Sequence, residues 1–331
     1  MRRHSRRHRL IFPLALGLLP LLAGCSMAQG SPAAPALSIQ TAKHRRANGT
    51  PIALEPVRLS KSARAHVPKG VRIYSLTYWS RGLRCQAYLD VPGGGRAYPL
   101  WVLLHGGDVW AEPGHYSGFP VMTPAFAAGA AQPDAITFLP NYGGYGPSQG
   151  DVGDGYDDYV DVMDGFTALR QITGLHVRPR DTVLSGASLG GIVALLTAAH
   201  DQAVRGVVLI SPWPGAEEMA SWLRSQPTAK LSTDDQLYAI SLSETCSSGL
   251  ESGWCRRNSA PYQDIKVPVL IVGGTRDPKN PPGVLRAMAS DLRRYNTHVE
   301  LRIVPGGHAP MTAAAGAIEH AWYAAHGWDL P

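Results

Sequence analysis

Short apolar runs alternate with longer amphipathic stretches along most of the chain. Residues 71–79 and 83–91 alternate apolar and polar positions on either side of a Ser-Arg-Gly turn, which predicts a β-hairpin. Six later runs are mostly apolar and rich in β-branched residues, as expected for strands buried on both faces. These runs are residues 100–104, 135–139, 182–184, 204–210, 267–272 and 299–304.

Helical spacing fills several of the intervals between these runs and follows the last of them. Apolar residues recur three and four positions apart in residues 159–172, 189–200, 281–295 and 309–325. An antiparallel hairpin followed by alternating strands and helices predicts an α/β fold. We expect a mostly parallel twisted sheet with helices on both faces.

Residues 211–264 separate two predicted core strands by far more than an ordinary loop. We interpret them as a cap insertion that acts as a lid and determines substrate choice. Its aromatic residues either wall an apolar substrate pocket or form a small core of the insertion itself. They are Trp213, Trp222, Tyr238, Trp254 and Tyr262.

The first 24 residues have the pattern of an export signal. An arginine-rich head leads into the apolar run 10–23, which is too short to span a bilayer and suits a signal-peptide core. The run ends in Leu-Ala-Gly-Cys, which resembles the bacterial lipobox, so we expect lipidation at Cys25 and a membrane-anchored lipoprotein. A plain secretory signal is the alternative, and the general and twin-arginine routes both stay open.

Charge changes this picture little once it is located. The 331-residue chain carries a formal charge of +6, but removing residues 1–24 takes away five of its 31 basic residues and lowers the charge to +1. This balance excludes a nucleic-acid binder. Residues 25–56, rich in Ala, Pro and Ser, predict a flexible tether, and residues 57–331 the folded domain.

The cysteines suit an exported protein. Cys246 and Cys255 flank a turn-like stretch, and we expect them to form a disulfide that stiffens the lid more than it supports the core. Closing this loop is worth roughly 2.7 kcal/mol in the chain-entropy model. Cys85 lies in an alternating run and is expected to be a buried thiol. No His/Cys spacing suits zinc, so we expect no metal.

Two G-x-S-x-G motifs occur, at residues 146–150 and 186–190. A nucleophile elbow needs a strand before its serine and a helix directly after it. Ser188 lies between a strand run and a helical stretch, whereas Ser148 lies in a Gly/Pro/Tyr-rich loop. We therefore assign Ser188 as the nucleophile and Ser148 to a loop.

The remaining members of a catalytic triad follow the last two predicted strands. Asp277 comes just after the run 267–272, and His308 just after 299–304, which gives the chain order Ser, Asp, His of α/β hydrolases. Asp291 and Glu300 lie within predicted elements and compete poorly for the role of the acid. We expect Ser188, Asp277 and His308 to form a triad that requires no cofactor.

Stabilising an oxyanion requires two donors. Leu189, which follows the nucleophile, supplies one backbone N–H. The other should come from the loop after residues 100–104, with Gly107 as first choice and Gly106 as second. His105 is expected to shape that loop and not to act as a base.

These motifs, with the segment 141–146 (Asn-Tyr-Gly-Gly-Tyr-Gly), resemble the catalytic domain of prolyl-oligopeptidase-like peptidases and dienelactone-hydrolase-like esterases. The resemblance covers about residues 70–328 and implies an α/β-hydrolase fold and a serine hydrolase. Leu189 replaces the tyrosine usual in the peptidase branch, and residues 26–70 are too few for that branch's propeller domain. The expected substrate is a small ester. A short peptide, an acyltransfer reaction and a non-catalytic binding role are the alternatives.

Overall fold

The computed structural model describes residues 36–39, 47–107, 121–227, 242, 244–246, 252–308 and 313–331. All of them belong to one compact unit, Ser31–Pro331. Cys25 and the predicted export signal lie outside the described residues.

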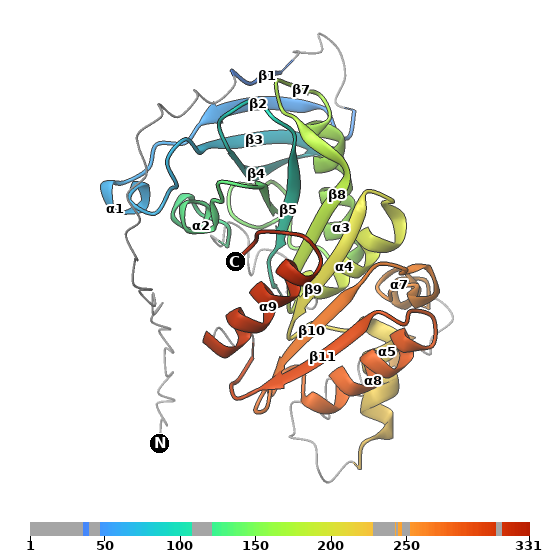
Figure 1. The fold of residues 1–331 in the computed structure, drawn as a ribbon. Helices are drawn as coiled ribbons and strands as arrows, with labels where there is room; N and C mark the ends of the chain where they lie inside the picture. Colours follow the sequence, from blue (N-terminus) through green and yellow to red (C-terminus); the bar gives the residue numbers. More distant parts are fainter. Residues whose placement is uncertain are drawn as a thin grey trace, which may run out of the picture. The chain divides into compact units, whose positions relative to one another are not determined.

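A nine-stranded sheet forms the centre of this unit, in the order β11-β10-β9-β8-β5-β6-β4-β3-β2 (Figure 1). The strands β5, β6, β8, β9, β10 and β11 run parallel to their neighbours in that set, and β4, β3 and β2 add to the β6 edge in antiparallel fashion. Their bounds are β2 Pro51–Pro56, β3 Arg72–Ser80, β4 Leu83–Val91, β5 Tyr98–Leu104, β6 Ile136–Asn141, β8 Val177–Ala187, β9 Val204–Ile210, β10 Val269–Gly274 and β11 Val299–Val304. The expectation of a mostly parallel sheet is confirmed.

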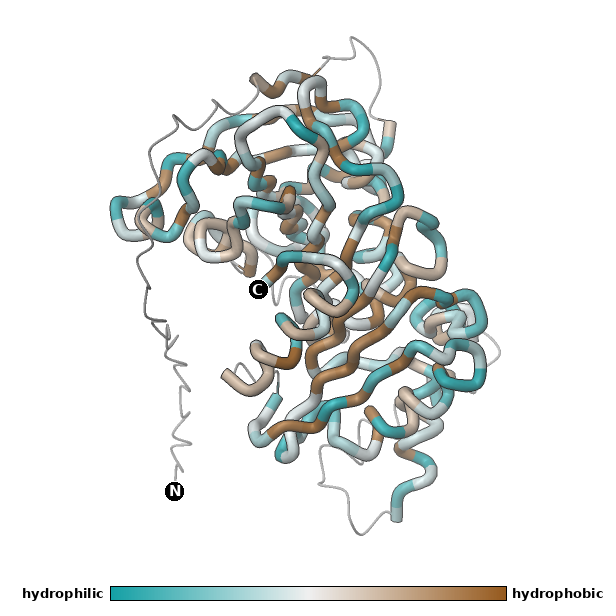
Figure 2. Tube along the Cα trace, viewed as in Figure 1, coloured by the Kyte–Doolittle hydropathy of each residue, from teal (hydrophilic) through white to brown (hydrophobic). Residues whose placement is uncertain are grey.

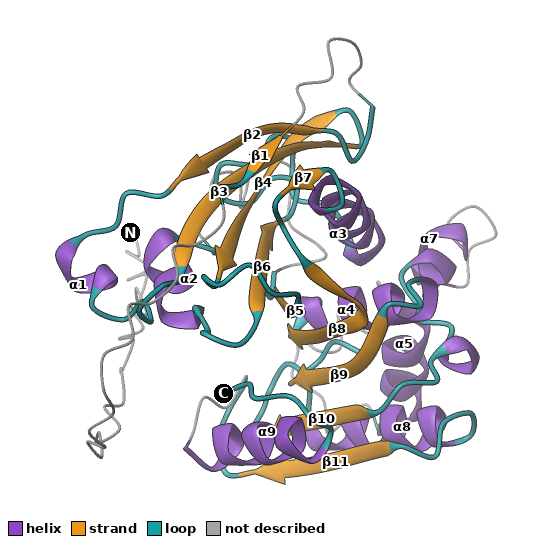
Figure 3. Ribbon diagram, turned by 45° about the horizontal axis from the view of Figure 1, so that its top comes forward, coloured by secondary structure: helices purple, strands orange, loops and turns teal. Residues whose placement is uncertain are grey.

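Helices cover both faces of the sheet (Figure 3). One face packs against α3 (Gly155–Leu169), α4 (Leu189–His200), α5 (Ala216–Ser225) and α8 (Pro282–Arg293), whose apolar residues join the largest core cluster. The other face packs against α2 (Pro124–Ala130) and α9 (Ala313–Ala325). Hydrophobic residues gather along β9 and β10 (Figure 2), as burial on both faces requires.

Most sequence-predicted elements appear within a few residues of their expected bounds. The strand runs 204–210 and 299–304 and the helix 189–200 coincide with β9, β11 and α4. Strand β8 instead begins at Val177, five residues before its apolar run. Arg178, Pro179 and Arg180 in this first part are exposed and not apolar strand formers, so hydrophobicity gave no sign of it.

The predicted tether contains structure at both of its described parts. Residues Ser38–Ile39 (β1) pair antiparallel with Ile172–Thr173 (β7). Pro51–Pro56 forms the edge strand β2 beside β3, where a flexible tether was expected through residue 56. Proline stands at both ends of this strand, and proline in a run argues against a strand except at a sheet edge, which explains why β2 was missed.

The described part of the 211–264 insertion packs on the sheet. Helix α5 contributes Met219, Ala220 and Leu223 to the main core, and Trp213 and Tyr262 are buried in the same cluster. Trp222 and Trp254 pack against it, so these four aromatics support the core of the protein. Tyr238 lies outside the described residues, as does much of the predicted lid.

The shorter elements are α1 (Lys61–Arg64), α7 (Ser252–Arg257) and a 3-10 turn at Tyr262–Asp264.

Cys246 and Cys255 form a disulfide with Cα atoms 5.4 Å apart, as predicted. Cys255 is buried in the main core cluster, and Cys246 packs against it. Cys85 on β4 is a free, fully buried thiol, which confirms its expected place. Burial raises the pKa of this thiol well above its usual value.

Candidate active site

Ser188 lies at a strained turn between β8 and α4. Its backbone has φ 53° and ψ −119°, a conformation that a non-glycine residue seldom adopts. The turn is held by hydrogen bonds from the Ser188 N–H to the Ile210 carbonyl (3.0 Å) and from the Gly191 N–H to the Ser188 carbonyl (2.9 Å). A Cβ at Gly186 would collide with the Gly190 carbonyl, so the flanking glycines permit this close packing.

His308 and Asp277 come from loops after two neighbouring strands, β11 and β10. His308 Nε2 is 3.0 Å from Ser188 Oγ, and His308 Nδ1 is 3.0 and 2.9 Å from the two Asp277 carboxylate oxygens. The Asp277 side chain is fully buried, whereas that of His308 is 24% exposed. The structure therefore brings the three sequence-predicted residues into one hydrogen-bonded chain, with the serine at its open end.

Asp277 is held as a carboxylate. Burial alone would raise its pKa, but hydrogen bonds from His308, the Asn280 N–H and the Ser211 side chain outweigh burial and lower the pKa below its ordinary value. The backbone N–H groups of Lys279 and Asn280 both donate to Oδ1, each over 2.9 Å. The acid is thus ionised and oriented before a substrate arrives.

The loop after β5 lies against the nucleophile. A Cβ built on Gly106 would be 3.1 Å from the Ser188 Cβ, and one built on Gly107 would strike the Tyr145 hydroxyl and lie 3.0 Å from the Leu189 side chain. Only glycine fits this approach at Gly107. Of the sequence candidates for the oxyanion site, Gly106 therefore lies beside Ser188, and Gly107 lies beside Leu189, the residue that follows the serine.

His105 shapes this loop, as predicted. Its Nδ1–H donates to the Gly106 carbonyl (2.8 Å), and its ring stacks on Tyr142 with centroids 3.9 Å apart. Burial lowers the pKa of His105 to about 4, so the ring is neutral at ordinary pH. Its contacts are structural ones.

Ser148 has a different surrounding from Ser188. Its hydroxyl donates to the Asn141 carbonyl (2.8 Å) and accepts from the Gln86 N–H (2.9 Å). Both bonds are internal, and the side chain is buried in a turn. The assignment of Ser148 to a loop is confirmed.

A buried ion-pair network behind the site was not anticipated. Asp161 on α3 is fully buried and accepts hydrogen bonds from Arg81 (3.0 Å), the Ser80 hydroxyl (2.6 Å) and the Gly143 N–H (2.7 Å). This anchors the 141–146 segment, whose tyrosines contact His105. Acidic residues three and four apart on α3, on the face that carries its apolar residues, were the available signal.

The described residues contain no group of three or more His, Cys, Asp and Glu that could hold a metal ion. Among the same residues, no helix is long and apolar enough to cross a membrane.

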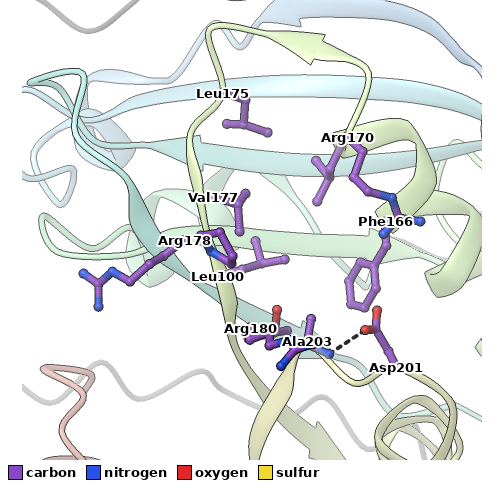
Figure 4. A pocket seen from close by; sticks show the side chains of 12 residues that line it. Leu100, Phe166, Arg170, Leu175, Val177, Arg178, Arg180, Asp201 and Ala203 are labelled. Carbon is purple, nitrogen blue, oxygen red and sulfur yellow. Dashed lines mark hydrogen bonds between the residues drawn. The ribbon is translucent and has the colours of Figure 1, made fainter.

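A hollow of about 480 Å³ lies at the start of β8, where Leu100, Phe166, Leu175 and Val177 face one another (Figure 4). Since Ser188 follows the other end of β8, this hollow is separate from the candidate site.

Residues 101–321 match the family model described as the alpha/beta hydrolase family. The acetyl xylan esterase from Paenibacillus sp. R4 superposes with a TM-score of 0.58 and 16% identity over 82% of this chain and 88% of that one. No curated protein matches the chain in sequence.

Two further solved structures have the same fold. The esterase Pf2001 from Pyrococcus furiosus has a TM-score of 0.53 and 13% identity, over 82% of this chain and 93% of that one. A puromycin-hydrolysing peptidase from Mycobacterium tuberculosis has a TM-score of 0.51 and 16% identity, over 75% of this chain and 38% of that one.

Proposed function

The chain belongs to the alpha/beta hydrolase family, and on this premise we propose that it hydrolyses carboxylic esters through Ser188, His308 and Asp277. The observation that carries the proposal is the hydrogen-bonded chain from the Ser188 hydroxyl through His308 to the buried Asp277 carboxylate. A serine hydroxyl is too weakly acidic to attack unaided. In this hydrogen-bonded arrangement, His308 is the base and Asp277 is the acid that orients it.

In the proposed reaction, Ser188 Oγ attacks the ester carbonyl while His308 Nε2 takes its proton. Backbone N–H groups of Leu189 and of Gly107, with Gly106 as the alternative, stabilise the tetrahedral oxyanion. Collapse of this intermediate breaks the ester C–O bond, and His308 returns the proton to the departing alcohol. The product of this half-reaction is an acyl group on Ser188.

Water completes the cycle. His308 removes a proton from the water as it attacks the acyl-enzyme, and then protonates Ser188 Oγ as the carboxylic acid leaves. Asp277 holds the imidazole orientation and stabilises its positive charge at both stages. All of these groups belong to the chain, so the proposed reaction draws on no cofactor.

We propose an ester substrate and not a peptide because the two esterases align over most of their own length and most of this chain. The peptidase aligns over only 38% of its own length. The test is a panel of p-nitrophenyl esters of graded chain length beside aminoacyl and dipeptidyl anilides, with Ser188→Ala as the blank. Ester turnover that Ser188→Ala abolishes supports the proposal. Faster anilide cleavage would favour a peptidase, and transfer of the acyl group to an added alcohol an acyltransferase. No turnover, with no labelling by a fluorophosphonate, would favour a binding protein.

We also propose that the protein is exported and anchored through lipid on Cys25. The support is the Leu-Ala-Gly-Cys sequence after an arginine-led apolar run. A single acyl chain binds membranes only marginally, so stable retention implies several chains. Wild-type protein from its native host should partition with membranes into detergent, and Cys25→Ala should not acquire lipid. Recovery of wild-type protein wholly in the soluble fraction would contradict the anchor.

A further inference from the structure

Ser211 occupies a strained backbone position at the end of β9. Its φ is 43°, and the residue is fully buried. Among the described residues, only three other non-glycine residues have positive φ: Arg81, Arg180 and Ser188. Glycine would adopt this conformation freely, and such strain persists only where the surroundings hold it.

Asn280 joins this strained residue to the loop that carries Asp277. The Asn280 side-chain amide donates to the Ser211 carbonyl over 2.7 Å, and its own backbone N–H donates to Asp277 Oδ1 over 2.9 Å. Asn280 is buried, with 3% of its surface exposed. One residue thus contacts both the end of β9 and the carboxylate.

Ser211 is fixed from the other side as well. Its N–H donates to the Val272 carbonyl of β10 over 2.7 Å. Its side chain hydrogen-bonds to the Asp277 carboxyl. The left-handed backbone therefore places three groups of one residue, N–H, carbonyl and hydroxyl, on β10 and the loop that follows it.

We propose that Ser211 and Asn280 are positioning residues, which clamp the Asp277 loop to the end of β9 and hold the carboxylate in line with His308. The inference rests on the proposed function, since it concerns the acid of that triad. Neither residue belongs to the hydrogen-bonded chain from Ser188 to Asp277.

The clamp acts on carboxylate orientation. Both Asp277 oxygens lie within 3.0 Å of His308 Nδ1, an arrangement that requires the carboxylate plane to be fixed. The Asn280 N–H fixes Oδ1, and the Ser211 hydroxyl supplies a further donor. Displacing a catalytic group by about 1 Å from a distance can cost about 100-fold in rate.

Ser211→Gly separates positioning from folding. It removes the hydroxyl and also relieves the left-handed strain, so we expect a Tm within about 3 °C of wild type. We expect kcat to fall about 10- to 100-fold with KM little changed, because no substrate contact is removed. Labelling of Ser188 by a fluorophosphonate should slow by a similar factor.

Arg180→Gly is the matched control. Arg180 is an exposed residue with φ 53°, in the first half of β8 and away from Ser188. Glycine relieves the same kind of backbone strain there, and kcat should remain that of wild type. If Ser211→Gly also keeps the wild-type kcat, the positioning role is wrong.

The split between kcat and KM gives a reading that a merely structural role would not change. In Ser211→Ala and Ser211→Gly, kcat per fluorophosphonate-reactive Ser188 should fall while KM is kept. A wild-type kcat per reactive site would contradict the inference.

Asn280→Leu tests the other half of the clamp with a side chain of similar size. It retains the backbone N–H to Asp277 and loses the amide bond to Ser211, so kcat should fall while KM is kept. If this variant does not fold, Ser211→Gly decides alone. Should the wild type itself show no Ser188-dependent turnover or labelling, the proposed function fails; normal wild-type turnover with unaffected Ser211 and Asn280 variants overturns only the clamp.

Discussion

The backbone N–H of Trp213 donates a hydrogen bond to the carbonyl oxygen of Ser188, over 2.8 Å. Trp213 lies at the start of the 211–264 insertion, and Ser188 is the proposed nucleophile. The same carbonyl accepts from Gly191 in the first turn of α4. The insertion therefore begins in direct contact with the nucleophile elbow, and a shift of its first residues acts on the backbone of Ser188.

Breaking the Cys246–Cys255 disulfide should affect substrate binding. We expect the Cys246→Ser/Cys255→Ser double variant to change KM or ester chain-length preference, because the bond closes a loop within the insertion. Loss of the cross-link costs at most roughly 2.7 kcal/mol in the chain-entropy model, and Cys255 lies in the core, so Tm should also fall. Kinetics on the ester panel measure the change in KM and in chain-length preference, and calorimetry measures the change in Tm. Unchanged kinetics with a lower Tm would assign the bond to the core alone.

Ser188→Ala and Ser148→Ala should have opposite effects. Loss of the nucleophile should lower kcat by a factor of about 10⁶ and leave Tm unchanged. Ser148→Ala should keep kcat but lose about 1–3 kcal/mol of stability, because the Gln86 N–H and the Asn141 carbonyl lose a buried partner. Fluorophosphonate labelling followed by peptide mapping should place the adduct on Ser188. An adduct on Ser148 would refute the assignment.

Asp277→Asn should reduce kcat about 10⁴-fold and leave measurable turnover. The amide keeps the size of the side chain but cannot stabilise the charge on His308, and it favours the wrong tautomer. Burst kinetics with a p-nitrophenyl ester will show whether acylation is the slowed step. A variant with more than a tenth of wild-type activity would argue against Asp277 as the acid.

Gly107→Ala should inactivate the protein through its backbone position. The added methyl group would strike the Tyr145 hydroxyl, so the loop must move and withdraw its N–H from the proposed oxyanion site. Removal of one such donor costs about 10²–10³ in kcat. Gly129→Ala in α2 is the matched control, since nothing lies within 4 Å of its Cβ and alanine favours a helix. Equal activity of the two variants would exclude Gly107.

Glu218→Gln should stabilise the protein at alkaline pH. Burial raises the pKa of Glu218 to about 7, and its Oε2 has no hydrogen-bond partner among the described residues. A raised carboxyl pKa contributes stability that is complete below about pH 4.5 and is lost as the pH rises through 7. The Tm advantage of Glu218→Gln should therefore be small at pH 5 and larger at pH 8. Glu217→Gln, at the exposed neighbouring position, should show no such trend.

Periodicity predicted the central elements well because they are buried. Strands such as β9 and β10 are buried almost throughout, so their hydrophobic residues mark them directly. Spacing also placed Ser188, Asp277 and His308 each just after a strand, and the parallel sheet brings the ends of β8, β10 and β11 to one edge. The match between chain order and sheet topology made the candidate site predictable.

Contacts that depend on backbone geometry were beyond the reach of sequence patterns. Nothing in the sequence marks Ser211 as a left-handed residue or pairs it with Asn280, 69 residues away. Arg81 and Asp161 likewise meet only because the β3–β4 hairpin turn lies over α3. The role of the aromatic residues in the insertion was ambiguous because the same aromatic residue types occur in protein cores and in the walls of pockets.

The buried Cys85 thiol has a practical consequence. It is 0% exposed, and burial keeps its pKa high, so an alkylating reagent can reach a reactive thiolate there only when the surrounding sheet opens. Cys246 and Cys255 are already paired, and among the described cysteines they leave Cys85 as the free thiol. The rate at which iodoacetamide modifies Cys85, in protein that starts after Cys25, therefore measures how fast the core opens. This measurement needs no introduced probe.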